Sequence, residues 1–329
     1  MPAIGTNTLT AVTDRYVMPT IPDQVYPSNV VLYRLMKANK KLIGGGTQIE
    51  IPLMYSRFSA GGAFRGFDVL NTTPADTVKN AVFEWKQHYV PFSVDGLTLL
   101  RNDSEDAIAS IVQLNSQQSR MEMAENLAAG LFSDGLVDPK DIDGFRGMVG
   151  NASIGNPNYG GIARASNPWW NSNIDASSAA LSFAVLQSWF GNGSHGGQHY
   201  TLLASRQEQY NRFIALYTAA GGGYGVQQHR TPEGHDEMLA SAGFTNALFN
   251  NTPWVVDSHV DDGPNSSNSR IYGFNENVLW WIVSPRGDFY VDPFQKPVNQ
   301  NAFVTMLYWA GNLACGSARL QGALTNITS

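Results

Sequence analysis

The chain has 329 residues and a net charge of −6, and 15% of its residues are charged, against roughly 25% in average soluble domains. Because no long basic run is present, a dedicated nucleic-acid-binding protein is not expected. The single cysteine, Cys315, excludes an intrachain disulfide and a multi-cysteine zinc site. No signal peptide is expected, and the longest apolar stretch, residues 278–283, is too short to cross a membrane.

Aromatic residues are abundant, with 8 Trp, 13 Tyr and 16 Phe. The cores of protein interfaces are poor in charge and rich in aromatic residues. The composition therefore fits a chain whose surface is largely covered by partners, and it fits an ordinary enzyme with a large core equally well. Composition alone leaves both interpretations open.

The N-terminal part predicts an extended arm followed by a short helix. Residues 1–27 are rich in Thr and Pro and show little periodicity. Ser28 is a suitable N-cap for an amphipathic helix, which ends in lysines and the glycines 44–46.

Residues 48–94 are predicted to form an excursion, a two-stranded ribbon that projects from the rest of the chain. Two strand-like runs, residues 48–55 and 80–94, enclose a middle segment rich in Gly, Asn and Thr. A two-stranded ribbon is marginally stable by itself in water, so something outside the ribbon is expected to hold it. An arm of this kind predicts a protein that assembles.

A single long helix is predicted after the excursion. Residues 103–106 supply caps and an acidic first turn, and apolar residues at helical spacing continue to about Phe132. The middle of the helix, residues 115–120, is polar nearly all round. At 1.5 Å per residue the helix is roughly 40 Å long. Because its middle is polar and expected to face solvent, the helix is predicted to be a spine that lies across a thin domain.

The remainder predicts a mixture of helices and strands without a repeating strand–helix–strand rhythm, which favours an α+β fold. Residues 144–168 are expected to be irregular, residues 182–190 and 206–217 helical, and a turn is expected at Gly311 and Asn312. The predicted strands are residues 199–204, 254–256, 270–274, 278–283, 289–291 and 301–309.

Candidate catalytic or ligand-binding motifs are weak. The glycine-rich residues 221–225 lack the third glycine of the dinucleotide pattern, because Gln228 stands there. Residues 194–197 resemble an oxyanion-hole element, but the chain has no G-x-S-x-G nucleophile elbow. The tryptophan pairs 169–170 and 280–281 are expected in the core or at an interface rather than stacked on a ligand.

The nearest approach to a metal cluster lies in a polar loop, and its spacing matches no helical H-E-x-x-H pattern. A solvated loop is the favoured interpretation, although a ring of these residues around a symmetry axis would be able to bind an ion. No catalytic, cofactor or metal site is predicted, and the chain is not expected to be an enzyme. The alternative is a hydrolase with a dispersed site, whose turnover would be abolished by changing His229 or His235. The loop residues concerned are His229, Glu233, His235, Asp236 and Glu237.

The order of parts resembles the major capsid protein of tailed bacteriophages, with the Hong Kong 97-type fold that encapsulin shells share. Residues 239–249 (LASAGFTNALF), followed by 252–257 (TPWVVD), are similar to the family's small apolar segment and the axial-domain strand after it. Residues 301–309, the Gly311–Asn312 pair with Leu313, and residues 317–324 (SARLQGAL) resemble the outgoing strand, turn and return.

The resemblance implies an α+β capsid fold with four parts. Residues 1–43 would be the N-terminal arm and short helix, and residues 44–94 the extended loop. Residues 95–178 and 284–316 would form a peripheral domain with a spine helix at 104–132, and residues 179–283 and 317–329 an axial domain. The implied function is a shell subunit that forms hexamers and pentamers of an icosahedral capsid around double-stranded DNA; an encapsulin-like shell or another phage structural protein is the alternative.

The resemblance also implies contacts and partners. A portal protein is expected, and so is a separate scaffolding protein, if there is scaffolding at all, because no helical extension precedes Pro27. A decoration protein is an open alternative, and the negative charge predicts weak contact with packaged DNA. The protein is expected in the virion after assembly in the host bacterial cytoplasm, with no cofactor and no membrane. The implied contacts with neighbouring subunits are Phe64, Arg65, Phe67, Val69, Leu70, Lys79, His229 and His235; Lys79 and Lys86 have no matched Asn for a covalent cross-link.

Overall fold

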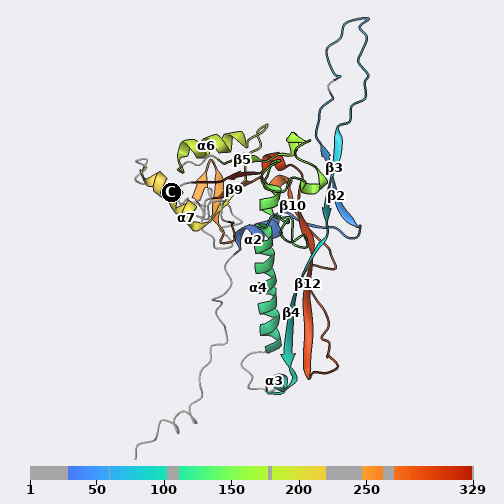
Figure 1. Cartoon of the computed structure of the whole chain (residues 1–329), viewed down its shortest axis with the longest axis vertical. Helices are drawn as coiled ribbons and strands as arrows, with labels where there is room; N and C mark the ends of the chain where they lie inside the picture. Colours follow the sequence, from blue (N-terminus) through green and yellow to red (C-terminus); the bar gives the residue numbers. More distant parts are fainter. Residues whose placement is uncertain are drawn as a thin grey trace, which may run out of the picture.

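A computed structural model of the chain describes residues 29–58, 60–101, 111–176, 180–219, 247–261 and 270–327. The predicted arm, the start of the long helix and the 221–237 loop with His229 and His235 lie outside these residues. The described part is elongated, with a long sheet below, a second sheet to one side and a two-stranded ribbon that continues into a projecting loop (Figure 1).

The first sheet is built on β12 (Ala302–Cys315), the longest strand described. One edge of β12 pairs with β4 (Lys86–Asp95), and the other pairs with β10 (Leu279–Val283) and β11 (Tyr290–Val291). The short strand β1 (Lys40–Leu42) extends this sheet beside β10. In β4 the side chains at even positions, from Lys86 to Val94, are more buried than those at odd positions, as expected of a sheet covered on one face.

The helix α4 (Ile111–Leu131) covers that face, running along β4 and β12 (Figure 1). It lies within the predicted spine of residues 104–132. Met123, Leu127 and Leu131 are fully buried at helical spacing, whereas the polar middle is only partly covered. The short helix α3 (Gly96–Arg101) follows β4 at the far tip.

The second sheet is mixed and buried on both faces. Its order is β5 (Asn173–Asp175), β13 (Gly322–Leu324), β9 (Ile271–Phe274), β6 (Leu202–Ser205), β8 (Thr252–Val256) and β7 (Ala247–Phe249). Alternate residues of one strand enter different hydrophobic clusters: Leu202 faces the cluster shared with α4 and the first sheet, and Leu203 faces a second one. This explains strands that are apolar throughout instead of alternating.

Two predicted helices pack together in that second cluster. α6 (Phe183–Asn192) begins at Ser182, whose side chain accepts a hydrogen bond from the Val185 amide, and α7 is Gln207–Ala219. Phe183 of α6 meets Phe213 of α7 edge to face at 6.2 Å. The predicted helices at 182–190 and 206–217 are therefore present.

The remaining elements join these layers. The helix α2 (Val30–Ala38) packs against α4, β8 and β10. Residues 144–168, expected to be irregular, are mostly loop and contain α5 (Phe145–Met148) and the 3-10 turn η1 (Tyr159–Gly161). Three further 3-10 turns are η2 (Pro168–Trp170), η3 (Glu276–Val278) and η4 (Ala318–Leu320).

The predicted return strand of residues 80–94 is wrong as a single element. The chain forms β3 (Val78–Glu84), which pairs with β2 (Gln48–Met54), and then β4, which pairs with β12. The buried positions are odd-numbered at Ala81 and Phe83 and even-numbered from Lys86 onward. Side-chain alternation therefore shifts by one residue at Trp85, where the chain changes partners.

The predicted turn at Gly311 and Asn312 is also wrong, because β12 continues through both residues. A Cβ atom at Gly311 would lie 2.3 Å from the Ile282 carbonyl oxygen, so this glycine permits a close approach between strands. Asn312 is buried, and its side-chain amide donates to the Glu84 carbonyl and to Asp143 Oδ2, each at 2.8 Å.

The strand β10 lies in the first sheet with β12, although residues 279–283 fall in the segment predicted as axial. The division into domains stays a prediction. In the described part of the chain, no helix combines the length and the hydropathy needed to cross a membrane.

Candidate assembly surface

The inner part of the ribbon, called the ribbon base here, comprises β2 and β3. One face of it carries Ile49, Leu53, Ala81 and Phe83, all buried. Phe83 packs edge to face on the Tyr159 ring at 5.3 Å. Gly160 has a φ of +62°, and a Cβ atom there would lie 3.2 Å from Phe83, so glycine allows η1 to approach the ribbon closely.

Polar and aromatic contacts fix the ribbon base at its two ends. The Tyr55 ring stacks on Trp169 at 5.3 Å, and Lys79 Nζ donates to Asn167 Oδ1 at 3.3 Å. At the other end Trp85 Nε1 donates to the Gly46 carbonyl at 3.1 Å. The outside support expected for the ribbon is thus supplied to its strands by residues of the same chain.

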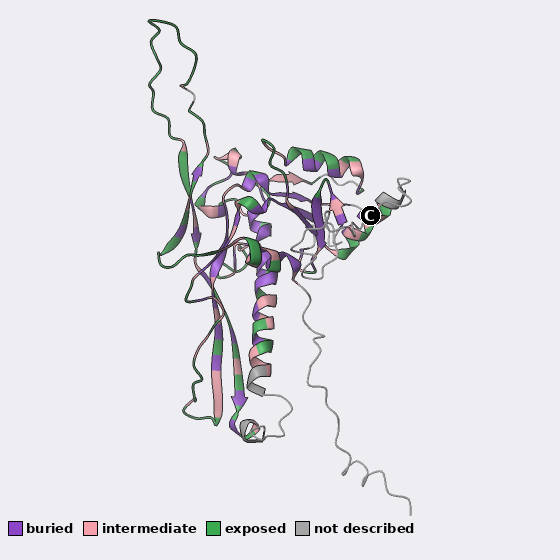
Figure 2. Ribbon diagram, turned by 180° about the vertical axis from the view of Figure 1, so that it is seen from behind, coloured by how far each residue is buried: buried purple, intermediate pink, exposed green. Residues whose placement is uncertain are grey.

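Residues 56–77, called the outer loop, project beyond the ribbon base. The last rung of the ribbon is the hydrogen bond from the Tyr55 amide to the Thr77 carbonyl, at 3.0 Å. Figure 2 shows the loop beyond this rung as exposed along nearly its whole length. The side chain of Phe67 is 106% exposed and that of Val69 is 98% exposed. The other large apolar side chains exposed on this loop are Phe58, Phe64 and Leu70.

A local turn shapes the tip of the outer loop. The Arg65 amide donates to Asp68 Oδ2 at 2.7 Å, and the Asp68 amide donates to the Arg65 carbonyl at 3.2 Å. The turn is held by its own polar groups, which leaves the apolar side chains on either side of it exposed. Contiguous exposed apolar residues of this kind mark interaction sites in soluble proteins.

The predicted contact residues fall into three groups. Phe64, Arg65, Phe67, Val69 and Leu70 are all exposed on the outer loop. Lys79 lies apart from them on β3, beside Asn167. His229 and His235 lie outside the described residues. Contact of any of these residues with a neighbouring subunit stays a prediction.

A second exposed apolar surface was missed from the sequence. It is the face of the first sheet opposite α4, called the open sheet face, and it carries Tyr89, Tyr290 and Met306. A hollow of about 350 Å³ lies beside it between residues 292–297 and β12. Its signal in the sequence was the alternation of residues 86–95, in which Tyr89 and Pro91 fall on the outward positions.

The tryptophan pairs and the cysteine considered in the sequence analysis take part in packing within the chain. Trp170 and Trp281 are buried in the core, as expected, while Trp169 stacks on Tyr55 and Trp280 lies under the Lys41 ammonium, 4.1 Å from its ring centroid. Cys315 is buried, and burial raises the pKa of its thiol to about 12.

His195 lies in an exposed turn, where Arg319 Nε donates to its Nε2 at 2.9 Å. Partial burial and the neighbouring Arg319 charge lower the His195 pKa. Over the described ranges, no group of three His, Cys, Asp or Glu side chains is arranged to hold a metal ion.

Comparison with known protein families and with curated protein sequences finds no match. Comparison with solved structures finds full-length similarity. The cyanophage A-1(L) capsid subunit superposes with a TM-score of 0.73 at 15% identity, over 99% of both chains. The capsid of a native GTA particle gives 0.64 at 11% identity, over 99% of this chain and 100% of that one.

The encapsulin SrpI of Synechococcus elongatus is also similar, with a TM-score of 0.61 at 9% identity over 99% of this chain and 96% of that one. These structures are shell subunits, and the shared architecture extends over nearly the whole chain. The chain therefore has an α+β fold that is similar to the fold of these subunits. This fold is the Hong Kong 97-type fold of tailed-phage capsid proteins, which confirms the fold expected from the order of parts.

Proposed function

We propose that the chain is the major capsid protein of a tailed bacteriophage. Copies of it assemble into hexamers and pentamers of an icosahedral shell that encloses a double-stranded DNA genome. The observation that carries this proposal is the full-length similarity to the cyanophage capsid subunit, which covers 99% of both chains. The exposed outer loop adds support, since it has the form of an arm made for a neighbouring copy.

The outer loop would supply a large part of the energy for contact between subunits. Burying one large apolar side chain stabilises a complex by about 1.5–3 kcal/mol. Five such side chains give on the order of 10 kcal/mol, before the entropic cost of ordering the loop is subtracted. Repeated around a closed shell, contacts of this size reinforce one another through multivalency.

The remaining partners follow from this role. We place the protein in the virion after assembly in the bacterial cytoplasm, with a portal protein and a separate scaffolding protein, and with a decoration protein as an option. The net charge of −6 supports weak contact with packaged DNA. In this role the chain has no catalytic duty.

An encapsulin-like shell is the second candidate, and the similarity to the encapsulin SrpI favours it. The two candidates differ in content, because an encapsulin-like shell would enclose cargo protein and a phage capsid would enclose DNA. Analysis of nucleic acid and protein in particles isolated from the natural source distinguishes them.

The test of assembly is sedimentation and electron microscopy of the purified protein over a range of concentration and ionic strength. The proposal predicts closed shells, or rings of five and six subunits. A compact monomer under every condition would overturn it.

A further inference from the structure

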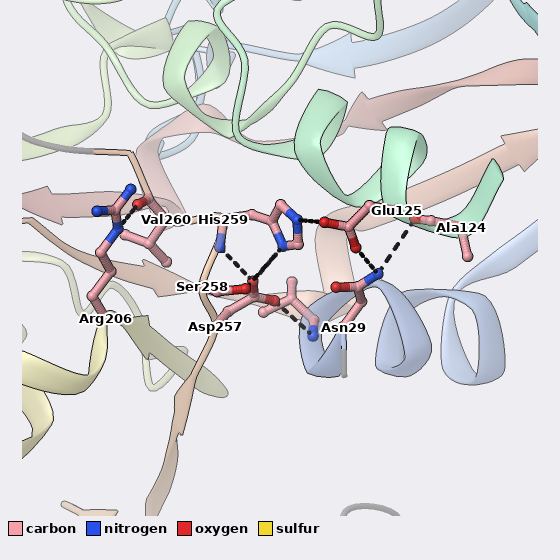
Figure 3. A network of polar contacts seen from close by, with 9 residues as sticks. Asn29, Ala124, Glu125, Arg206, Asp257, Ser258, His259 and Val260 are labelled. Carbon is pink, nitrogen blue, oxygen red and sulfur yellow. Dashed lines mark hydrogen bonds and ion pairs between the residues drawn. The ribbon is translucent and has the colours of Figure 1, made fainter. Parts of the chain in front are cut away.

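The helix α2 is a connector between the spine helix α4 and the second sheet (Figure 3). At its start, Asn29 Nδ2 donates to Glu125 Oε2 of α4 at 3.2 Å. Two residues further, the Val31 amide donates to Oδ2 of Asp257, which lies just after strand β8, at 3.4 Å. The beginning of α2 is thus bound to a carboxylate on each side.

His259 lies between the same two carboxylates. Its Nε2 is 2.6 Å from Glu125 Oε1, and its Nδ1 is 3.2 Å from Asp257 Oδ1. Its backbone amide also donates to Asp257 Oδ1, at 3.0 Å. The Asp257 side chain is 1% exposed, that of His259 12% and that of Glu125 27%. All four carboxylate oxygens are therefore occupied within one largely buried network.

The two carboxylate contacts of His259 together require a charged ring. An ionised carboxylate accepts hydrogen bonds and cannot donate them, and a neutral imidazole has only one N–H. Because each ring nitrogen of His259 faces a carboxylate oxygen, both contacts are satisfied only when both nitrogens carry a proton. Loss of one proton leaves a nitrogen lone pair directed at a carboxylate oxygen.

We propose that Glu125, Asp257 and His259 form a pH-sensitive clasp between α4 and the second sheet. The clasp is closed when the His259 ring carries two protons, and it loosens when the ring loses one. Residues 125 and 259 are 134 positions apart, so the clasp joins segments that only the folded chain brings together. The proposal concerns the subunit itself and does not depend on the function proposed above.

The charges around His259 support this behaviour. Glu125 faces it from α4 and Asp257 from its own segment, whereas α2 contributes the neutral Asn29 amide and the Val31 N–H. The Arg206 guanidinium donates to the Val260 carbonyl at 2.6 Å. When the ring is neutral, the positive charge that His259 places between the two carboxylates is lost, and their mutual repulsion is less well compensated.

The direction of the pH effect follows from the His259 pKa, which is raised above its ordinary value. The hydrogen bond with Asp257 is the main cause; burial opposes the rise, while the hydrogen bond with Glu125 and the charges of both carboxylates add to it. The folded protein therefore binds this proton more tightly than the unfolded chain does. The stabilisation is complete below about pH 6.5 and is lost as the pH rises through the raised pKa.

The clasp is one of several contacts between α4 with the first sheet and the second sheet. Apolar contacts also join these parts, such as Phe132 against Tyr272 at 5.9 Å, and these do not titrate. Opening of the clasp therefore leaves the sheets packed while removing one polar link between α4 and the second sheet. We expect local loosening around Asn29 and Glu125 and no global unfolding.

The test is hydrogen–deuterium exchange of the purified protein, measured by mass spectrometry from pH 6 to pH 8.5 and corrected for the chemical exchange rate. In the wild type, protection of residues 29–38 and 123–131 should fall on the order of tenfold across the range. In His259→Gln this pH dependence should disappear, because the ring that titrates is gone. The matched control, His195→Gln, removes a histidine whose pKa is lowered and should keep the wild-type profile.

Glu125→Gln provides a second variant in case His259→Gln folds poorly. It preserves the size of the side chain and removes one carboxylate, so the loss of protection should occur at lower pH than in the wild type. A His259→Gln profile with the wild-type pH dependence, or a Glu125→Gln profile that does not move, would overturn the proposal. A His259→Gln profile that lies below the wild type by the same amount at every pH, with the wild-type pH dependence retained, would also overturn it, because a purely structural contact gives that result.

Discussion

The ribbon base and the outer loop meet at the backbone hydrogen bond between Tyr55 and Thr77. The apolar side chains of the base are buried, whereas those of the loop are exposed to solvent. In the base, Phe83 is 1% exposed and packs on Tyr159. In the loop, Phe67 is fully exposed. The same residue type therefore stabilises the subunit on one side of the rung and is available to a partner on the other.

The base is buried and the loop is exposed because residues 159–170 cover only the base. Residues 159–170 lie against β3 and reach only as far as Tyr55, through Trp169. Beyond this point no other part of the described chain supports the loop. The base belongs to the fold of one subunit, and the loop needs a second molecule to bury its apolar surface.

The largest effect on subunit stability is expected for Phe83→Ala. Removing a fully buried Phe lowers the free energy of unfolding by about 3–5 kcal/mol. Denaturant unfolding of the unassembled protein measures this loss, with Phe67→Ala as the matched control at less than about 0.5 kcal/mol. Equal losses of unfolding free energy in the two variants would contradict the conclusion that the base is part of the folded subunit and the loop is not.

Asn312→Ala should have the next largest effect, about 2–4 kcal/mol, because it leaves several buried groups without a partner. Asn312 binds the Glu84 carbonyl at the end of the ribbon base and also accepts from the Asp143 amide at 3.1 Å. The same unfolding measurement checks the loss, and Asn277→Ala, at an exposed position, is the control. A loss no greater than in that control would mean that Asn312 does not fix the base.

A smaller effect is expected at the border between base and loop. Tyr55 and Trp169 stack at 5.3 Å, and an aromatic pair contributes about 0.5–1.5 kcal/mol beyond its buried area. A double-mutant cycle with Tyr55→Ala and Trp169→Ala should give a coupling energy in this range. If the losses of the two single variants simply add, Tyr55 and Trp169 do not stabilise each other, and the folded part of the ribbon would end before Tyr55.

The smallest effect on folding, and a large one on assembly, is expected for replacing Phe67, Val69 and Leu70 together by Ser. The free energy of unfolding of the unassembled subunit should change by less than about 0.5 kcal/mol. The yield of particles in sedimentation should fall sharply, because the apolar surface for the neighbour is gone. Normal particle yield from a stably folded variant would contradict the role assigned to the loop.

The sequence predicted elements whose signals are local. The helical spacing of Met123, Leu127 and Leu131 identified the spine helix, and Ser182 marked the start of α6. The Gly, Asn and Thr residues between the two strand-like runs identified a segment that does not enter the core. In each case a short stretch of chain contains the whole physical reason for the structure.

The features that the sequence did not predict depend on residues far apart in the chain. The run of residues 80–94 reads as one strand because the change of partners at Trp85 is set by β2 and β12. Gly311 resembles a turn residue, but the backbone of β10 is what requires it. The clasp around His259 needs Glu125, and nothing near His259 in the chain points to α4.

Thiol labelling of a Phe67→Cys variant tests most directly whether the outer loop lies on a neighbouring subunit. The only native thiol, Cys315, is buried and has a raised pKa, so a maleimide reagent will report on position 67 alone. Rapid labelling of unassembled subunits and strong protection in sedimented particles is the predicted result. Equally rapid labelling in unassembled subunits and in sedimented particles would contradict the account.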